Sequence, residues 1–281
     1  MDFRTASIAG AIALTFSTSS FALDLQPYTT KGAPIGKTVF SLGHQKVDNS
    51  KAKVDGTSVR LTHYFDLAGR RAVFDAKQFY LDIEGKGALN DASGPSAFAL
   101  GGGIYLIDDK QKGDYLLAGM FVATPTGQYS SSRLANPGAN IYTYIPKIAY
   151  HTSLTDKIDM AVSADVTFYE DNKKYNNPLG GIQVLKKDPQ FNTQASFMYA
   201  VDPTLNLNTS IFYHEGGDTS HSVTNTAPVN LNGRTENTQA SVGFRKITDV
   251  GAFSVSYKKD INHVSGTEMN SQWDVKWKIA W

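Results

Sequence analysis

The stretch "WDVKWKIAW" (Trp273–Trp281) places a large apolar side chain at every second position. Successive side chains of a β-strand point to opposite faces, so this stretch predicts a strand with two unlike faces. Trp273, Val275, Trp277, Ile279 and Trp281 lie on one face, and Asp274, Lys276, Lys278 and Ala280 lie on the other. Something apolar must cover the first face, either a second sheet or a lipid bilayer.

The same alternation recurs along the chain in about twelve segments, most of them close to the length of a tilted transmembrane strand. The clearest example is "KIDMAVSADVTFY" (Lys157–Tyr169), in which Ile, Met and Val alternate with Asp and Ser. The predicted strands are 36–47, 57–66, 74–84, 98–107, 114–123, 142–152, 157–168, 190–201, 205–213, 236–247, 251–259 and 272–281.

The connections between these segments alternate in length. "SLTD", "DPT" and "TDVG" are tight turns, whereas "DNKKYNNPLGGIQVLKKDPQ" and "HEGGDTSHSVTNTAPVNLNGRTE" are long polar loops. Short turns on one side and long loops on the other are typical of an outer-membrane barrel with both termini in the periplasm. The sequence therefore predicts an all-β protein, a transmembrane antiparallel up-and-down β-barrel of about 12 strands in the outer membrane of a Gram-negative bacterium.

A soluble β-sandwich is the alternative, because its strands alternate as well. Its connections need not fall into two length classes, and it needs no aromatic residues at the ends of its strands. An interfacial girdle in a membrane barrel does need them. Aromatic residues at predicted strand ends are Tyr142, Tyr144, Tyr150, Phe168, Tyr169, Phe191, Tyr213, Tyr257, Trp273 and Trp281.

The amino-terminal stretch "MDFRTASIAGAIALTFSTSSFA" has a basic residue near its start, an apolar run and small residues spaced like a cleavage site. It predicts a signal peptide over residues 1–22 and a mature barrel over residues 23–281. After Ala22, no run approaches the roughly twenty apolar residues of a membrane-spanning helix. The sequence leaves open whether residues 23–35 lie in the periplasm or plug the lumen.

The composition argues against several other classes of protein. Without cysteine there is neither a disulfide nor a thiolate metal site, and the net charge of +1 favours neither nucleic acid nor an acidic tail. His214 and His221 share one predicted long loop, where solvated histidines are a better interpretation than a metal site. No nucleophile and base are visibly paired, so we expect no enzyme, no metal and no cofactor.

The polar face of each strand would line the barrel lumen. The residues predicted to line the pore are Arg60, Asp82, Asp159, Asp165, Gln194, Arg245 and Lys276. A polar network that merely fills a narrow barrel is the alternative, since twelve strands enclose only a small or partly plugged pore. "AFALGGGIYLI" and "DYLLAGMFVA" are apolar on both faces, so they are expected to pack on something inside the barrel.

The carboxy-terminal half of the chain resembles a known family. The run "VATPTGQYSSSRLANPGANIYTYIPKIAYH" is followed by "DMAVSADVTFYEDNKKYN", "DPQFNTQASFMYAVDPTLNLNTSIFYHEGG" and "TQASVGFRK". In this order the segments resemble the MetA-pathway of phenol degradation family of outer-membrane β-barrel proteins, which look like distant relatives of the long-chain fatty acid transporter barrels. The resemblance implies passage of hydrophobic or aromatic compounds.

The predicted function is an outer-membrane channel that passes small, hydrophobic or aromatic molecules by passive diffusion. The alternative is a structural or surface-interaction barrel with a closed lumen and partner-binding loops. The expected partners are outer-membrane lipid, a small hydrophobic solute, and the barrel assembly machinery, for which Trp281 would be the assembly signal. The protein is expected to be a monomer.

Overall fold

The structure is a computed structural model and describes residues 27–87, 89–176, 182–222, 229–230 and 234–281. The predicted signal peptide, residues 1–22, lies outside the described residues.

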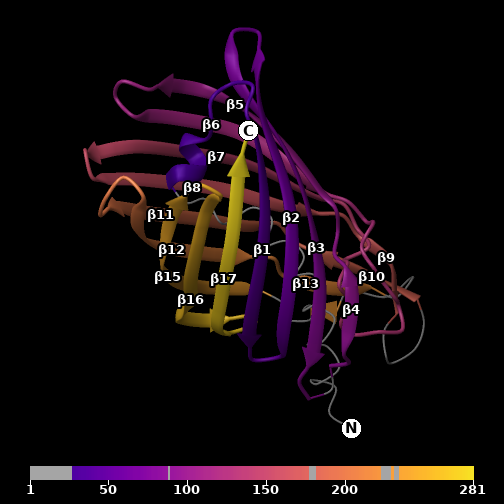
Figure 1. The fold of residues 1–281 in the computed structure, drawn as a ribbon. Coiled ribbons are helices and arrows are strands. Elements are labelled where there is room, and N and C mark those ends of the chain that lie inside the picture. Colours follow the sequence, from indigo (N-terminus) through magenta and orange to yellow (C-terminus); the bar gives the residue numbers. More distant parts are fainter. Residues whose placement is uncertain (1–26, 88, 177–181, 223–228, 231–233) are drawn as a thin grey trace.

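Twelve antiparallel strands form one closed barrel (Figure 1). The sheet closes because β1 pairs with β17, and β2 pairs with both β1 and β3. Its strands are β1 (Thr38–Asn49), β2 (Ala52–Leu67), β3 (Arg70–Gly85), β5 (Ala99–Asp109), β6 (Asp114–Ala123), β7 (Thr143–Thr155), β8 (Ile158–Tyr169), β11 (Gln190–Ala200), β12 (Leu205–Gly216), β15 (Thr235–Thr248), β16 (Gly251–Ser265) and β17 (Met269–Ala280). The predicted barrel is confirmed, and a two-sheet sandwich is wrong.

The two ends of the barrel differ in their connections. At the turn end, which we assign to the periplasm, the connections are residues 68–69, 110–113, 156–157, 201–204 and 249–250. At the loop end, residues 86–98, 124–142, 170–189 and 217–234 connect the strands, and β4 (Ala92–Pro95) pairs there with β3. The remaining loop-end connections, 50–51 and 266–268, are tight turns. The predicted strands 36–47, 57–66, 251–259 and 272–281 are therefore too short at this end, where the strands continue beyond the bilayer.

The outer face of the barrel carries a belt of large apolar side chains. Leu61, Ile211, Val242 and Trp273 are 40–59% exposed. No soluble protein would leave a continuous belt of this kind in water, whereas lipid covers it at no cost. The barrel therefore lies in the outer membrane. No helix in the described part of the chain is long and apolar enough to cross a membrane.

At the loop end the polarity of the two faces is reversed. The inward side chains of β3 there are Phe79, Leu81 and Ile83, all buried, and they pack with loop residues such as Leu89 in one hydrophobic core. The outward side chains are charged and exposed, as Asp82 is. Beyond the membrane the barrel wall is packed like a soluble protein, with an apolar interior and a polar exterior.

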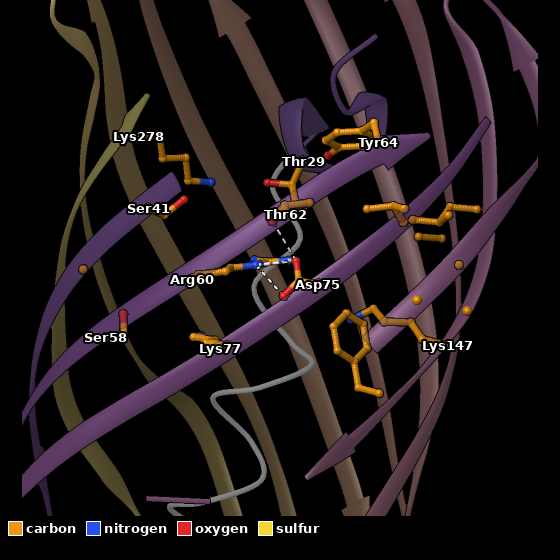
Figure 2. A pocket seen from close by; sticks show the side chains of 18 of the residues that line it. Thr29, Ser41, Ser58, Arg60, Thr62, Tyr64, Asp75, Lys77, Lys147 and Lys278 are labelled. Carbon is orange, nitrogen blue, oxygen red and sulfur yellow. Dashed lines mark hydrogen bonds and ion pairs between the residues drawn. The ribbon is translucent and has the colours of Figure 1, made fainter. Parts of the chain in front are cut away.

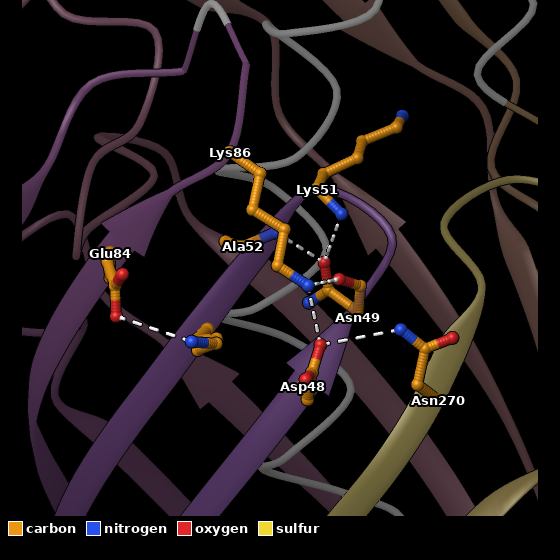
Figure 3. A network of polar contacts seen from close by, with 8 residues as sticks. Asp48, Asn49, Lys51, Ala52, Glu84, Lys86 and Asn270 are labelled. Atoms are coloured by element: carbon orange, nitrogen blue, oxygen red, sulfur yellow. Dashed lines mark hydrogen bonds and ion pairs between the residues drawn. The ribbon is translucent and has the colours of Figure 1, made fainter.

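A polar network ties the loop ends of β1, β2, β3 and β17 together (Figure 3). Lys86 Nζ donates to Asp48 Oδ1 at 2.6 Å and to the Asn49 carbonyl at 2.7 Å. The Asn49 side chain accepts from the backbone N–H groups of Lys51 and Ala52, each at 2.8 Å. These bonds provide partners for two backbone N–H groups and one carbonyl group of the tight turn.

At the turn end, the segment before β1 lies inside the barrel. Its short helix α2 (Pro27–Lys31) lies against β6, β7, β8 and β11. Tyr105 donates to the Thr30 carbonyl at 3.0 Å, and Arg71 donates to the Ala33 carbonyl at 2.9 Å. At Gly32 the φ angle is +69°, and a β-carbon there would overlap the Tyr105 hydroxyl.

The sequence left the place of residues 23–35 open. Of these, Thr29, Thr30 and Ala33 contact the inner wall at the turn end of the lumen, and residues 23–26 lie outside the described residues. The expectation that "AFALGGGIYLI" and "DYLLAGMFVA" pack on something inside the barrel is confirmed. Tyr105 and Tyr115 from those segments form a cluster with Tyr64, against which Ala33 packs.

Four short strands form a second sheet at the loop end. They are β9 (Asn172–Asn176), β10 (Ile182–Lys187), β13 (Thr219–Ser222) and β14 (Val229–Asn230). These residues belong to predicted loops, because their pattern is too short and too polar to indicate strands.

Candidate functional site

The barrel lumen holds two adjoining cavities, with volumes of about 90 and 140 Å³. The first lies next to α2 and is lined chiefly by β1, β2, β3, β5, β6, β7 and β17 (Figure 2). The second extends toward the loop end along β1, β12, β15, β16 and β17. Gly43, Ser58, Lys77 and Lys276 line both, so the two cavities are neighbouring parts of one lumen.

A buried ion pair lies in the wall of the first cavity. Arg60 holds the Asp75 carboxylate through Nε, at 2.7 Å, and through a terminal guanidinium nitrogen, at 2.6 Å. Thr62 donates to the same carboxylate at 2.8 Å. A carboxylate with three donors is well compensated for its burial, so this pair is a fixed element of the wall.

A second ion pair lies on the neighbouring part of the wall. Lys147 on β7 is 3.4 Å from Asp165 on β8, and both side chains are almost fully buried. Asn192 donates to Asp165 at 2.7 Å, and His214 contacts Asn192 at 2.9 Å. This chain of contacts continues to Gln239 and on to Asp260. The polar side chains of β8, β11, β12, β15 and β16 thus form a connected network.

The part of the wall made by β5 and β6 is apolar. Inward positions there are taken by Gly103, Leu117, Gly119 and Phe121, all of which line the first cavity. A β-carbon at Gly119 would meet the backbone of β5, so the glycines hold the two strands in close contact. Inward apolar side chains at membrane depth are unusual in an aqueous pore, whose lining is normally polar.

The structure places most of the predicted pore residues on the inner face. Arg60 and Lys276 line the first cavity, and Asp165 lies behind Lys147. Gln194 is buried and donates to Ser196 at 2.7 Å. Arg245 occupies an inward position of β15, opposite Asn206 of β12.

Asp159 lies nearer the turn end, where it accepts from Ser153 at 2.7 Å and lies 3.6 Å from His151. Asp159 therefore lies apart from Arg60, which pairs with Asp75.

The prediction for Asp82 is wrong. Asp82 is exposed on the outer face of β3 near the loop end, and Leu81 and Ile83 on either side of it point inward. Polar side chains face the lumen only in the part of the barrel that lies within the membrane. Asp82 lies beyond that part, on the loop side.

Asp75, Lys77 and Lys147 also face the lumen and were not among the residues predicted to line the pore. The prediction that Asp82 faces the lumen placed the odd-numbered positions of β3, and with them Asp75 and Lys77, on the lipid face. A signal was present, because charged side chains in the middle of a membrane strand must face the lumen and so fix the phase.

His214 is not a loop residue. It is buried on the inner face of β12, within the polar network, and the side chain of His221 lies outside the described residues. In the described part of the chain, no group of three or more His, Cys, Asp and Glu residues could hold a metal ion.

Comparison with known proteins identifies the family. The model of the MetA-pathway of phenol degradation family matches residues 36–273, nearly the whole barrel. The chain belongs to this family. No curated protein matches the sequence significantly.

Solved structures show the fold that this member of the MetA-pathway family shares. An outer membrane channel from Pseudomonas putida F1 is 20% identical with a TM-score of 0.83, covering 92% of this chain and 100% of its own. The transport unit of the autotransporter AIDA-I from Escherichia coli is 9% identical with a TM-score of 0.58, covering 99% and 98%. The Pseudomonas putida toluene transporter TodX is 11% identical with a TM-score of 0.50, covering 91% of each chain. At these identities the likeness concerns the barrel alone.

Proposed function

We propose that the barrel is a channel through which small hydrophobic or aromatic molecules cross the outer membrane by passive diffusion. The observation that carries the proposal is the apolar wall of β5 and β6 in the first cavity. A lumen built only for ions and sugars has no use for Leu117 and Phe121 at inward positions, whereas a hydrophobic solute is stabilised by them. Solute and outer-membrane lipid are the proposed partners of a monomeric barrel.

Filling the first cavity tests the proposal. Ser41 lies on the inner face of β1 and lines this cavity, while its neighbour Leu42 faces lipid. Ser41→Trp should reduce the uptake of monoaromatic and fatty solutes by liposomes and cells at least about tenfold, because an indole ring is larger than the free volume. Leu42→Trp adds the same ring on the lipid side and should leave uptake unchanged. Equal uptake by both variants would contradict a route through this cavity.

A closed barrel that binds partners through its loops is the second candidate. The observations that favour it are the hydrophobic core at the loop end and α2 at the turn end, which narrow the lumen from both sides. This candidate predicts that the unaltered protein passes neither ions in planar bilayers nor any solute of the panel.

A further inference from the structure

We infer that the lumen selects amphiphilic organic anions, in particular aromatic carboxylates, over neutral and cationic solutes of the same size. The inference rests on the proposed function and specifies its substrate class. It follows from the charge of the cavity lining, from where that charge lies, and from the apolar wall across the lumen.

The described lining of the two cavities is strongly cationic. Its carboxylates are Asp75 and Asp274, and its basic side chains are Arg60, Lys77, Lys147, Lys258, Lys276 and Lys278. Counting Asp165 behind Lys147 and Asp260 behind Gln239 still leaves two more positive than negative groups. A net charge does not depend on which groups pair, so the lining attracts anions whatever contacts the lysines make.

Two of the lumen lysines and the apolar wall lie on different sides of the lumen. Lys276 and Lys278 are on β17, whereas Leu117 and Phe121 are on β6. Between β17 and β6 the sheet runs through β1, β2, β3 and β5, so the two strands are nearly opposite in a ring of twelve. Figure 2 shows Lys278 on the far side of the cavity from Lys147, which lies beside the apolar wall and pairs with Asp165. A ligand with its carboxylate at Lys276 and Lys278 would have its apolar body against β6.

The net positive charge of the lumen favours a carboxylate over a neutral group. In a narrow lumen of low dielectric constant, a carboxylate interacts with the surrounding positive charge more strongly than it would in water, and it accepts charge-assisted hydrogen bonds. The apolar body of the ligand gains from contact with β6. The cavity volumes of about 90 and 140 Å³ suit one aromatic ring, since an apolar protein cavity of about 150 Å³ binds benzene.

The test compares three ligands that each carry one benzene ring and a small substituent but differ in charge: benzoate, benzyl alcohol and benzylammonium. With the protein in lipid nanodiscs at neutral pH, calorimetry should show benzoate binding at least about tenfold more tightly than either of the others. Lys276→Gln combined with Lys278→Gln should abolish this preference and leave benzyl alcohol unaffected. Lys259→Gln removes the same charge from the exposed outer face and should change nothing.

The apolar wall is tested by a second variant. Phe121→Ser should weaken benzoate at least about threefold and leave acetate unchanged, because only benzoate has a ring to bury. Heat-modifiable migration on gels checks that each variant still folds. If benzyl alcohol binds as tightly as benzoate, or benzylammonium binds more tightly, the inference is overturned.

Uptake by liposomes separates the two proposals. If benzoate binds with the expected preference but does not enter the liposomes, the anion site is supported and the proposed transport function is wrong. If all three solutes enter at the same rate and bind with the same affinity, the transport function is supported and the anion site is wrong.

Discussion

Lys187, in the sheet outside the barrel, is a buried cation with an unusual acidity. Its side chain is almost fully buried, and Nζ lies 4.4 Å from the centre of the Tyr169 ring. Burial lowers its pKa from 10.5 to about 7. Between about pH 7 and 10.5 the folded sheet therefore holds mostly the neutral amine, where the unfolded chain holds an ammonium group.

This acidity predicts how the stability of the sheet depends on pH. Between about pH 7 and 10.5 the unfolded state binds more protons than the folded state, so stability rises with pH across that window. Below pH 7 both states are protonated and the full cost of burial remains. Lys187→Met should therefore protect the 170–189 connection from proteolysis most strongly at pH 6 and hardly at all at pH 10.

The neighbouring lysine is the control for this experiment. Lys186 is half exposed and lies 3.8 Å from Asp171, so Lys186→Met should show no such dependence on pH. The same pH profile for both variants would show that burial of Lys187 is not its cause.

At the scale of the strand, phase decides which substitutions the membrane tolerates. Val162 of β8 is 38% exposed and faces lipid, while Ser163 faces the lumen. Val162→Arg should lower the free energy of unfolding by about 2–4 kcal/mol if the residue is near the bilayer midplane. Ser163→Arg should cost little. Urea unfolding in lipid vesicles measures both, and the reverse order of stability would mean that the strand is shifted by one residue.

For some strands, the sequence alone predicts which side chains face the lipid and which face the lumen. Phase could be predicted for β8 and β17, where the lipid face and the polar face both lie at membrane depth. It could not be predicted for β3 from Phe79, because that residue belongs to a hydrophobic core at the loop end. The alternation of apolar and polar residues shows which face of a strand is apolar. It does not show whether lipid or a packed protein interior covers that face.

The candidate site was predictable only in part, for a related reason. Arg60, Asp165 and Lys276 follow from alternation alone. The partners of Arg60 and Asp165, which are Asp75 and Lys147, depend on the shear of the barrel, which sets which residues of neighbouring strands lie side by side. The position of α2 in the lumen depends on contacts with Arg71 and Tyr105, more than 35 residues away in the chain.

At the scale of the whole molecule, closure of the barrel depends on the pairing of its first and last strands. Thr38 and Trp281 exchange both backbone hydrogen bonds, each at 3.1 Å, and the Trp281 side chain is 58% exposed toward lipid. Trp281→Asp should lower the yield of folded, heat-modifiable barrel, because a charge at this closing pair opposes insertion and leaves two sheet edges.

Trp281→Phe keeps an aromatic ring at the interface and should fold normally. Equal yields of the Asp and Phe variants would show that the aromatic side chain plays no part in assembly.

The reversed polarity at the loop end also fixes the height of the protein in its membrane. Strands β2 and β3 have 16 residues each, which at about 3.3 Å per residue and a tilt of about 40° rise roughly 40 Å. An apolar band of about 25 Å leaves roughly 15 Å of wall above the lipid. The outer mouth of the lumen therefore opens among the sugars of the outer leaflet, and a solute must cross that hydrated layer before it meets the barrel.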